Sequence, residues 1–187
     1  MAVKSKLGVA LAMVGLMALV PVTASAEERT CRGTIGATTL DNVRVPQNAE
    51  CVLKRTHVEG TAKVERNATL RAKRVRVIGN VQGENARRVN VVKRSRVGGS
   101  VQVVQGSAAK VAKSRVTGDV LYDENAAFLK IRRNQVNGSV QAFQNTGGVK
   151  ITKNVIDGNL QCKENAPGPT GGGNVVHGNK EDQCAGL

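Results

Sequence analysis

The regularly spaced functional side chains of this chain are basic. Lysine or arginine recurs every 19 or 20 residues, at Arg55, Arg74, Arg94, Lys113, Arg133 and Lys153. Two residues further along, a shorter series consists of Arg76, Arg96 and Arg115, with His57 at the preceding equivalent place. If segments of this period stack, the cations form a row with a spacing of about 4.8 Å, and we expect both series to emerge on one face. Such a row suits a polymer that carries regularly spaced negative charges.

Two interpretations of this row remain open. Like charges on neighbouring strands repel, so the row indicates either a negatively charged ligand or a solvated face whose repulsion is screened by salt. Charged outward faces also keep sheet proteins from associating edge to edge. The candidate ligands are an anionic polysaccharide, lipopolysaccharide or the phosphate backbone of a nucleic acid. Aromatic side chains that would stack on bases are scarce, so a nucleic acid would be held through its phosphates.

The sequence does not indicate catalysis, and we expect no enzyme activity, metal or cofactor. The only histidines, His57 and His177, are far apart in the chain. No Ser/His/Asp set, metal-ligand cluster or phosphate loop is present. The adjacent acids Asp123 and Glu124 would point to opposite faces of a strand, so they make a poor carboxylate pair.

The cations belong to a longer repeat that is marked by glycine. Seven glycines recur with the same period: Gly60, Gly79, Gly99, Gly118, Gly138, Gly158 and Gly178. Valine or isoleucine lies two residues before each of them, and apolar residues alternate with polar ones within each segment. Alternation with a period of two is typical of half-buried strands, and a fixed period of about twenty residues is typical of a solenoid.

These patterns predict an all-β fold, namely a single-stranded parallel β-solenoid (a β-helix) of about seven coils. Each coil would consist of three short strands joined by tight corners. We expect the coil to be right-handed, although nothing in the sequence specifies its hand. One corner would use the repeat glycine and a second would use asparagine, because both residues tolerate positive φ. Serine and asparagine four residues before the glycine would form a ladder along the axis: Ser95, Ser114, Asn134, Asn154 and Asn174.

The ends of the chain differ from the repeats. Residues 1–26 read as a secretory signal peptide, with Lys4 and Lys6 before an apolar stretch and Ala24-Ser25-Ala26 before the cleavage point. Residues 27–187 would form one solenoid domain, with caps at 27–42 and 163–187. No other stretch is apolar enough to span a membrane, so we expect a secreted or periplasmic protein. The four cysteines are spaced by about one coil at each end, which favours two local disulfides: Cys31 with Cys51, and Cys162 with Cys184.

Two resemblances accompany this interpretation. The phrase Val-x-Gly-[Asn/Ser/Asp]-[Val/Leu], as at Val77–Val81 and Ile156–Leu160, resembles the repeat of bactofilins. That resemblance implies a right-handed solenoid that polymerises end to end into a scaffold. The segment from Gly158 to Cys184 is similar to the ending of a group of uncharacterised exported bacterial repeat proteins. That resemblance implies the fold and export but no activity. The signal peptide, the terminal cysteine pairs and the basic face depart from the bactofilin pattern. Cysteine pairs that cap both ends argue against end-to-end polymerisation.

The sequence thus leads to two functional hypotheses. The first is an exported, non-catalytic protein whose cations bind an anionic polymer or surface. The alternative is a structural or assembly protein of the cell envelope, in which the same cations form a solvated face. The oligomeric state does not follow from either pattern.

Overall fold

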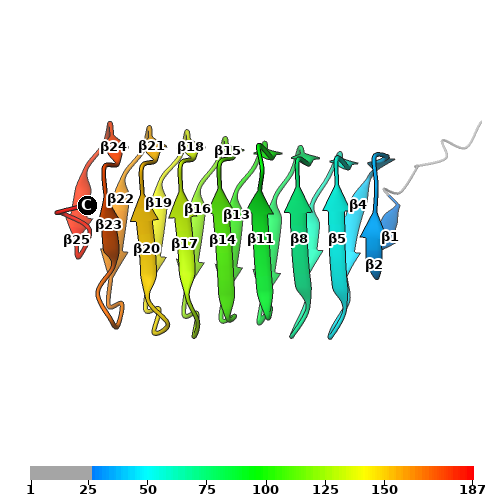
Figure 1. The fold of residues 1–187 in the computed structure, drawn as a ribbon, viewed down its shortest axis with the longest axis horizontal. Coiled ribbons are helices and arrows are strands. Elements are labelled where there is room, and N and C mark those ends of the chain that lie inside the picture. Colours follow the sequence, from blue (N-terminus) through cyan, green and yellow to red (C-terminus); the bar gives the residue numbers. More distant parts are fainter. Residues whose placement is uncertain (1–26) are drawn as a thin grey trace, which may run out of the picture.

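The computed structural model describes residues 27–187 and is a parallel β-solenoid of about eight turns (Figure 1). The predicted signal peptide, residues 1–26, lies outside the described residues. No α-helix occurs within residues 27–187, and every strand pairs in parallel with its equivalents in the neighbouring turns. The predicted fold class is therefore confirmed. The number of turns is slightly higher than the seven repeat glycines suggest, because strands before Gly60 also join the sheets.

Three sheets run the length of the solenoid. Sheet A contains nine strands: β1 (Glu28–Thr30), β4 (Asn42–Val45), β7 (Ala62–Val64), β10 (Val81–Glu84), β13 (Val101–Val104), β16 (Val120–Asp123), β19 (Val140–Phe143), β22 (Leu160–Lys163) and β25 (Lys180–Asp182). Sheet B contains eight strands: β2 (Gly33–Ile35), β5 (Glu50–Lys54), β8 (Thr69–Lys73), β11 (Arg88–Val92), β14 (Ala108–Ala112), β17 (Leu129–Arg132), β20 (Val149–Thr152) and β23 (Thr170–Gly172). Sheet C contains eight two-residue strands: β3 (Thr39–Leu40), β6 (His57–Val58), β9 (Arg76–Val77), β12 (Arg96–Val97), β15 (Arg115–Val116), β18 (Gln135–Val136), β21 (Val155–Ile156) and β24 (Val175–Val176).

The solenoid is right-handed. In Figure 1 the strands of sheet B run upward on the near side, and the chain then crosses the top through sheet C. It returns downward on the far side through sheet A while it advances from right to left. Right-handed crossovers between parallel strands are the general rule, because a right-handed strand twist packs that way.

The core is narrow and is filled mainly by β-branched and small side chains. Inward positions alternate with outward ones along each strand, as in β13, where Val101 and Val103 are buried. The valine or isoleucine two residues before each repeat glycine is buried in the six turns from Val58 to Ile156. The largest fully buried side chain is Tyr122, whereas Phe128 is about half exposed. Short stacked strands therefore fold without a large aromatic core because each turn buries its apolar residues against its neighbours.

The repeat glycines are required for a different reason from the one that we predicted. None of the seven has positive φ. Instead, a Cβ atom at Gly138 would lie 2.3 Å from Asp119 Oδ1 and 2.8 Å from the Gly118 carbonyl carbon of the preceding turn. At this corner, between sheets C and A, the N–H group of one glycine donates to the carbonyl of the previous glycine, as in Gly99 to Gly79. Glycine is needed because adjacent turns approach too closely for a side chain.

The corner between sheets A and B agrees only partly with the asparagine prediction. Asn48, Asn67 and Asn85 have positive φ, as expected. In later turns the residue before the asparagine takes this conformation, for example Glu124 with a φ of 52°. The asparagine that follows, Asn125, is then fully buried. The same residue type therefore occupies two different places in the corner.

Polar ladders run along the solenoid axis at all three corners. The predicted Ser/Asn ladder between sheets B and C is confirmed, since Asn134 Oδ1 accepts from the Ser114 N–H at 3.0 Å. A second buried ladder, between sheets A and B, includes Asn125, Asn145 and Asn165. A third joins the residues that follow the repeat glycines through seven hydrogen bonds from backbone N–H groups to side chains. These ladders satisfy backbone donors that tight corners would otherwise leave unpaired.

Both ends of the solenoid are cross-linked as predicted. The disulfides join Cys31 to Cys51 and Cys162 to Cys184, with Cα–Cα distances of 5.6 Å and 5.2 Å. Residues 27–42 supply β1 to β3 and so form the first turn. At the other end, residues 163–187 supply the last strands and a final stretch in which Leu187 packs against the core. Disulfides persist in oxidising surroundings, so they indicate a non-cytoplasmic compartment.

Candidate anion-binding surface

The main series of cations lies at the corner between sheets B and C. We call Arg55, Arg74, Arg94, Lys113, Arg133 and Lys153 the basic corner. All six are exposed, and all six have positive φ, between 52° and 64°. Each of them lies just after a strand of sheet B and is followed by a buried residue that turns the chain into sheet C. The six cations are therefore corner residues rather than strand residues, and they lie beside the shorter arginine series rather than on the same strand face.

This conformation is unfavourable for arginine and lysine. The left-handed region costs residues with a side chain roughly 1–2 kcal/mol, and glycine and asparagine visit it most readily. The corner between sheets A and B also has one such residue in each turn, but uses uncharged or acidic types: Asn48, Asn67, Asn85, Gln105, Glu124, Gln144 and Glu164. Non-glycine residues with positive φ are therefore all cations at the corner between sheets B and C, whereas none of them is a cation at the corner between sheets A and B.

The shorter series lies on sheet C, next to the basic corner. Arg76, Arg96 and Arg115 are exposed and in direct register on β9, β12 and β15. His57 precedes them in the same register, and Gln135 follows and accepts a hydrogen bond of 2.6 Å from Arg115. The three arginines therefore extend the positive charge of the corner onto the adjoining sheet.

Sheet B continues the positive surface on the other side of the corner. Lys110, Lys130 and Lys150 face outward in register on β14, β17 and β20. Of the fourteen acidic residues in the chain, only Glu50 lies on a strand of sheet B, and none lies on a strand of sheet C. The acids are concentrated on sheet A and at its two corners. The charge of the molecule is therefore separated around the solenoid axis.

The basic corner is not neutralised from within the described residues. The ion pairs of residues 27–187 are Arg44 with Glu28 and Glu65, Arg87 with Glu50, Lys163 with Glu164, and His177 with Asp157. None of them includes a residue of the basic corner. Since all six cations are also solvent-exposed, their charges are available to an external anion.

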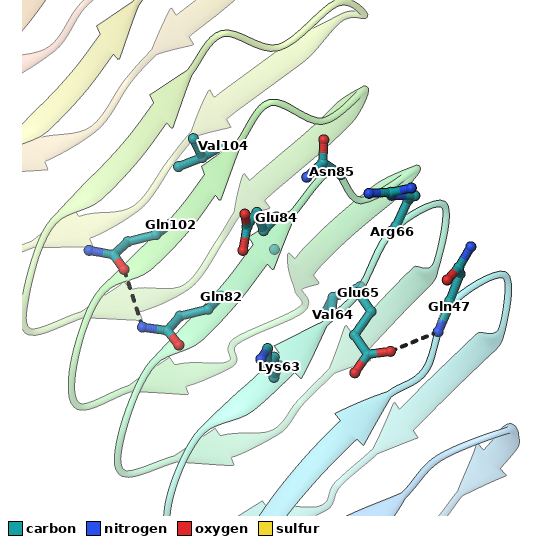
Figure 2. Close-up of a pocket in the computed structure, with 11 residues that line it drawn as sticks. Gln47, Lys63, Val64, Glu65, Arg66, Gln82, Glu84, Asn85, Gln102 and Val104 are labelled. Carbon is teal, nitrogen blue, oxygen red and sulfur yellow. Dashed lines mark hydrogen bonds between the residues drawn. The ribbon is translucent and has the colours of Figure 1, made fainter.

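Sheet A, away from the basic corner, carries a groove of about 680 Å³ with mixed charge (Figure 2). Outward glutamines three residues after four of the repeat glycines pair between turns. Gln82 donates to Gln102 at 3.4 Å, and Gln141 donates to Gln161 at 2.9 Å. Figure 2 shows Glu65 accepting from the backbone N–H of Gln47, at 3.0 Å. Acidic and basic side chains both line the groove, so it offers a weaker case for an anionic ligand than the basic corner does.

The other titratable residues that we considered from sequence do not gather into one site. His57 and His177 lie near opposite ends of the solenoid, and the second pairs with Asp157 at 3.0 Å. Asp123 projects outward from β16, and Glu124 occupies the following corner. Burial, and then the charge of Glu124, raise the pKa of Asp123. No group of three His, Cys, Asp or Glu side chains that could hold a metal ion occurs within residues 27–187.

Two features of the surface could not be read from the sequence pattern. Positive φ at the basic corner is not visible in a pattern of lysines and arginines, because these residue types do not signal the left-handed region. An extra residue in one turn was also missed. Lys93 and Arg94 both have positive φ, where the other turns have a single such residue at this corner. The lengthening of that turn from 19 to 20 residues was the only available signal.

Comparisons with protein-family models, curated proteins and solved structures gave no match to this chain. Among residues 27–187, no helix has the length and apolar character needed to cross a membrane.

Proposed function

We propose that this protein is a non-catalytic binding protein whose basic corner engages an anionic polymer or surface. The observation that carries the proposal is the residue choice at the corner. Six successive turns place arginine or lysine in a conformation that glycine or asparagine would adopt with less strain. At the matching corner between sheets A and B, no residue with positive φ is a cation. A solvated face would not need its charges at the strained position.

The geometry supports a linear ligand. Adjacent turns are about 4.8 Å apart, so six cations span on the order of 25 Å along the axis. The arginines of sheet C and the lysines of sheet B flank this row on both sides. Suitable ligands are an anionic polysaccharide, lipopolysaccharide or the backbone of a nucleic acid. Export to the periplasm or the cell exterior belongs to the same proposal and is supported by the two disulfides.

The test is binding of residues 27–187, with both disulfides formed, to duplex DNA, a heparin-like polysaccharide and lipopolysaccharide. Each is measured at about 50 and about 200 mM salt, a range over which several phosphate contacts change affinity by orders of magnitude. We expect tight binding to at least one ligand that weakens steeply with salt. On duplex DNA, each charge removed should lower the slope of log affinity against log salt by about 0.9.

The structure offers a matched pair of variants. Replacing Arg94, Lys113 and Arg133 by glycine removes three charges at positions where glycine fits the backbone. Replacing Asn85, Gln105 and Gln144 by glycine makes the same three backbone changes at the opposite corner without removing positive charge. We expect only the first variant to lose affinity. Absence of binding at the lower salt, or equal losses in both variants, would refute the proposal and favour a structural role in the envelope.

A further inference from the structure

The basic corner is not uniform along its length, because a hollow of about 470 Å³ lies at its N-terminal end. Its lining consists of Gly36, Ala37, Lys54, Arg55, Lys73, Arg74 and Lys93. Five of these residues are cations and none is acidic. Unlike the groove on sheet A, this hollow is lined by cations without any acidic residue.

The hollow exists because the first turn has small residues where the next turns have long ones. The register of β2 with β5 and of β3 with β6 places residues 36–38 beside residues 54–56. A Cβ atom added at Gly36 would meet no heavy atom within 4 Å, so the space there is open. The Thr56 hydroxyl lies 2.8 Å from the Gly36 carbonyl oxygen and 3.3 Å from that of Ile35. This contact anchors the loop that borders the hollow.

An extra residue adds positive charge to the opposite side of the hollow. Lys73 is in register with Val92, and Arg76 is in register with Arg96. The corner between β11 and β12 is therefore one residue longer than the corner between β8 and β9. Lys93 lies in this longer corner and contributes to the lining. The inserted residue thus adds a fourth turn to the three that already line the hollow.

The cations around the hollow are close together and lack internal partners. Lys54 and Lys73 are directly opposite on neighbouring strands, an arrangement that like charges disfavour. Within residues 27–187, none of the five cations of the lining takes part in an ion pair. Arg55 and Arg74 present guanidinium groups, which match two oxygens of a phosphate or sulfate, and the lysines add point charges. An anion bound here would relieve the repulsion among all five.

We propose that this hollow is a subsite for one sugar-sized unit that carries two or more phosphate or sulfate groups. Its volume lies within the range of small-molecule sites and exceeds what a single oxyanion needs. The inference rests on the proposed function, since the unit would be the most highly charged part, or the end, of the polymer held along the basic corner. Because the hollow lies at one end of the row of cations, a polymer whose terminal unit binds there would lie along the basic corner in a single orientation.

The test uses small ligands that are too short to span the basic corner. The ligands for titration calorimetry are glucose 1,6-bisphosphate, a heparin-type sulfated disaccharide and inorganic phosphate. The first two compare phosphate with sulfate, and inorganic phosphate compares a single charged group with two. We expect one-to-one binding of at least one doubly charged sugar, about tenfold or more tighter than inorganic phosphate. The backbone amide resonances of Gly36 and Ala37 should shift on binding.

Two variants of equal charge locate the ligand. Replacing Arg55, Arg74 and Lys93 by glycine should weaken binding of the small ligand about tenfold or more, whereas replacing Lys113, Arg133 and Lys153 should leave it unchanged. All six positions have positive φ, so glycine is compatible at each. Should the first variant lose its circular dichroism spectrum, replacing Lys54 and Lys73 by glutamine tests the same hollow without altering a corner.

The outcomes separate the two proposals. If the polymer binds but the small ligand does not, or if both variants weaken the small ligand equally, the subsite is refuted and the proposed function stands. If no polymer binds while the small ligand binds with the expected dependence on the variants, the proposed function is refuted and the hollow is a separate anion site.

Discussion

The substitution Asn134→Ala probes the ladder that supports the basic corner. Asn134 is 3 % exposed, and its side chain makes three hydrogen bonds. Its Oδ1 accepts from the Ser114 N–H at 3.0 Å, while its Nδ2 donates to the Val111 carbonyl at 2.9 Å and to Asn154 Oδ1 at 3.1 Å. Each such bond contributes about 1 kcal/mol, and an unsatisfied buried N–H group costs about 1–3 kcal/mol more. We therefore expect the free energy of unfolding to fall by about 4 kcal/mol.

The assay is urea unfolding of residues 27–187 with both disulfides intact, followed by far-ultraviolet circular dichroism and by the near-ultraviolet signal of Tyr122. Both signals must give the same transition, because repeat proteins can lose two-state behaviour. The control is Asn137→Ala, at an exposed residue three positions away, which should change stability by less than about 0.5 kcal/mol.

A second substitution at the same position distinguishes loss of the ladder from loss of volume. Ser95 occupies the equivalent position and accepts the Val75 N–H at 3.2 Å, so Asn134→Ser should restore part of the stability. We expect it to fall about midway between the parent and the alanine variant. If the alanine variant lies within about 1 kcal/mol of the parent, or serine is no better than alanine, the ladder does not support the corner.

Three further predictions concern the ends, the repeat glycine and the buried tyrosine. Replacing Cys31 and Cys51 together by alanine should cost about 3 kcal/mol in urea unfolding, because a loop of about twenty residues is no longer closed in the unfolded chain; reducing agent should have no further effect at this end. Gly138→Ala should lower the thermal midpoint, since its Cβ would lie 2.3 Å from the ladder carboxylate of the preceding turn, whereas Gly168→Ala, with open space around it, should not. Burial raises the pKa of Tyr122, and its hydroxyl lies near the Val111 backbone without a regular hydrogen bond. The contribution of Tyr122 to stability should therefore be constant below about pH 10, where the unfolded tyrosine begins to ionise, and fall above it; Tyr122→Phe should reduce that alkaline loss, and an unchanged alkaline limb of the pH profile would contradict the assignment.

Much of the fold followed from the sequence because one period governs the entire chain. Each turn contacts only its neighbours, so a column of similar residues in the sequence becomes a column in space. The buried valines from Val58 to Ile156, the ladder through Asn134 and the pairing of Cys31 with Cys51 all follow from that correspondence. None of these predictions needed long-range information, because sequence separation and axial position are proportional in a solenoid.

The corners could not be derived in the same way. The stacking of neighbouring turns decides which residue of a tight corner takes positive φ. In corners of similar sequence, that residue can therefore shift by one position. Asn85 takes that conformation itself, whereas Asn125 leaves it to Glu124 and turns into the core. The repeat glycine illustrates the same difficulty, since its requirement comes from the close approach of another turn and not from its own backbone.

The sequence therefore predicted the solenoid architecture, the parallel stacking of its strands and the row of cations along its axis. It could do so because period-two alternation and a twenty-residue repeat permit few arrangements. The packing of neighbouring turns places the row at strained corner positions and leaves its charges without partners among the described residues. It also places the start of the row in a hollow beside Gly36. These properties depend on contacts between turns and on a single inserted residue, Lys93, which a column of aligned residues does not reveal.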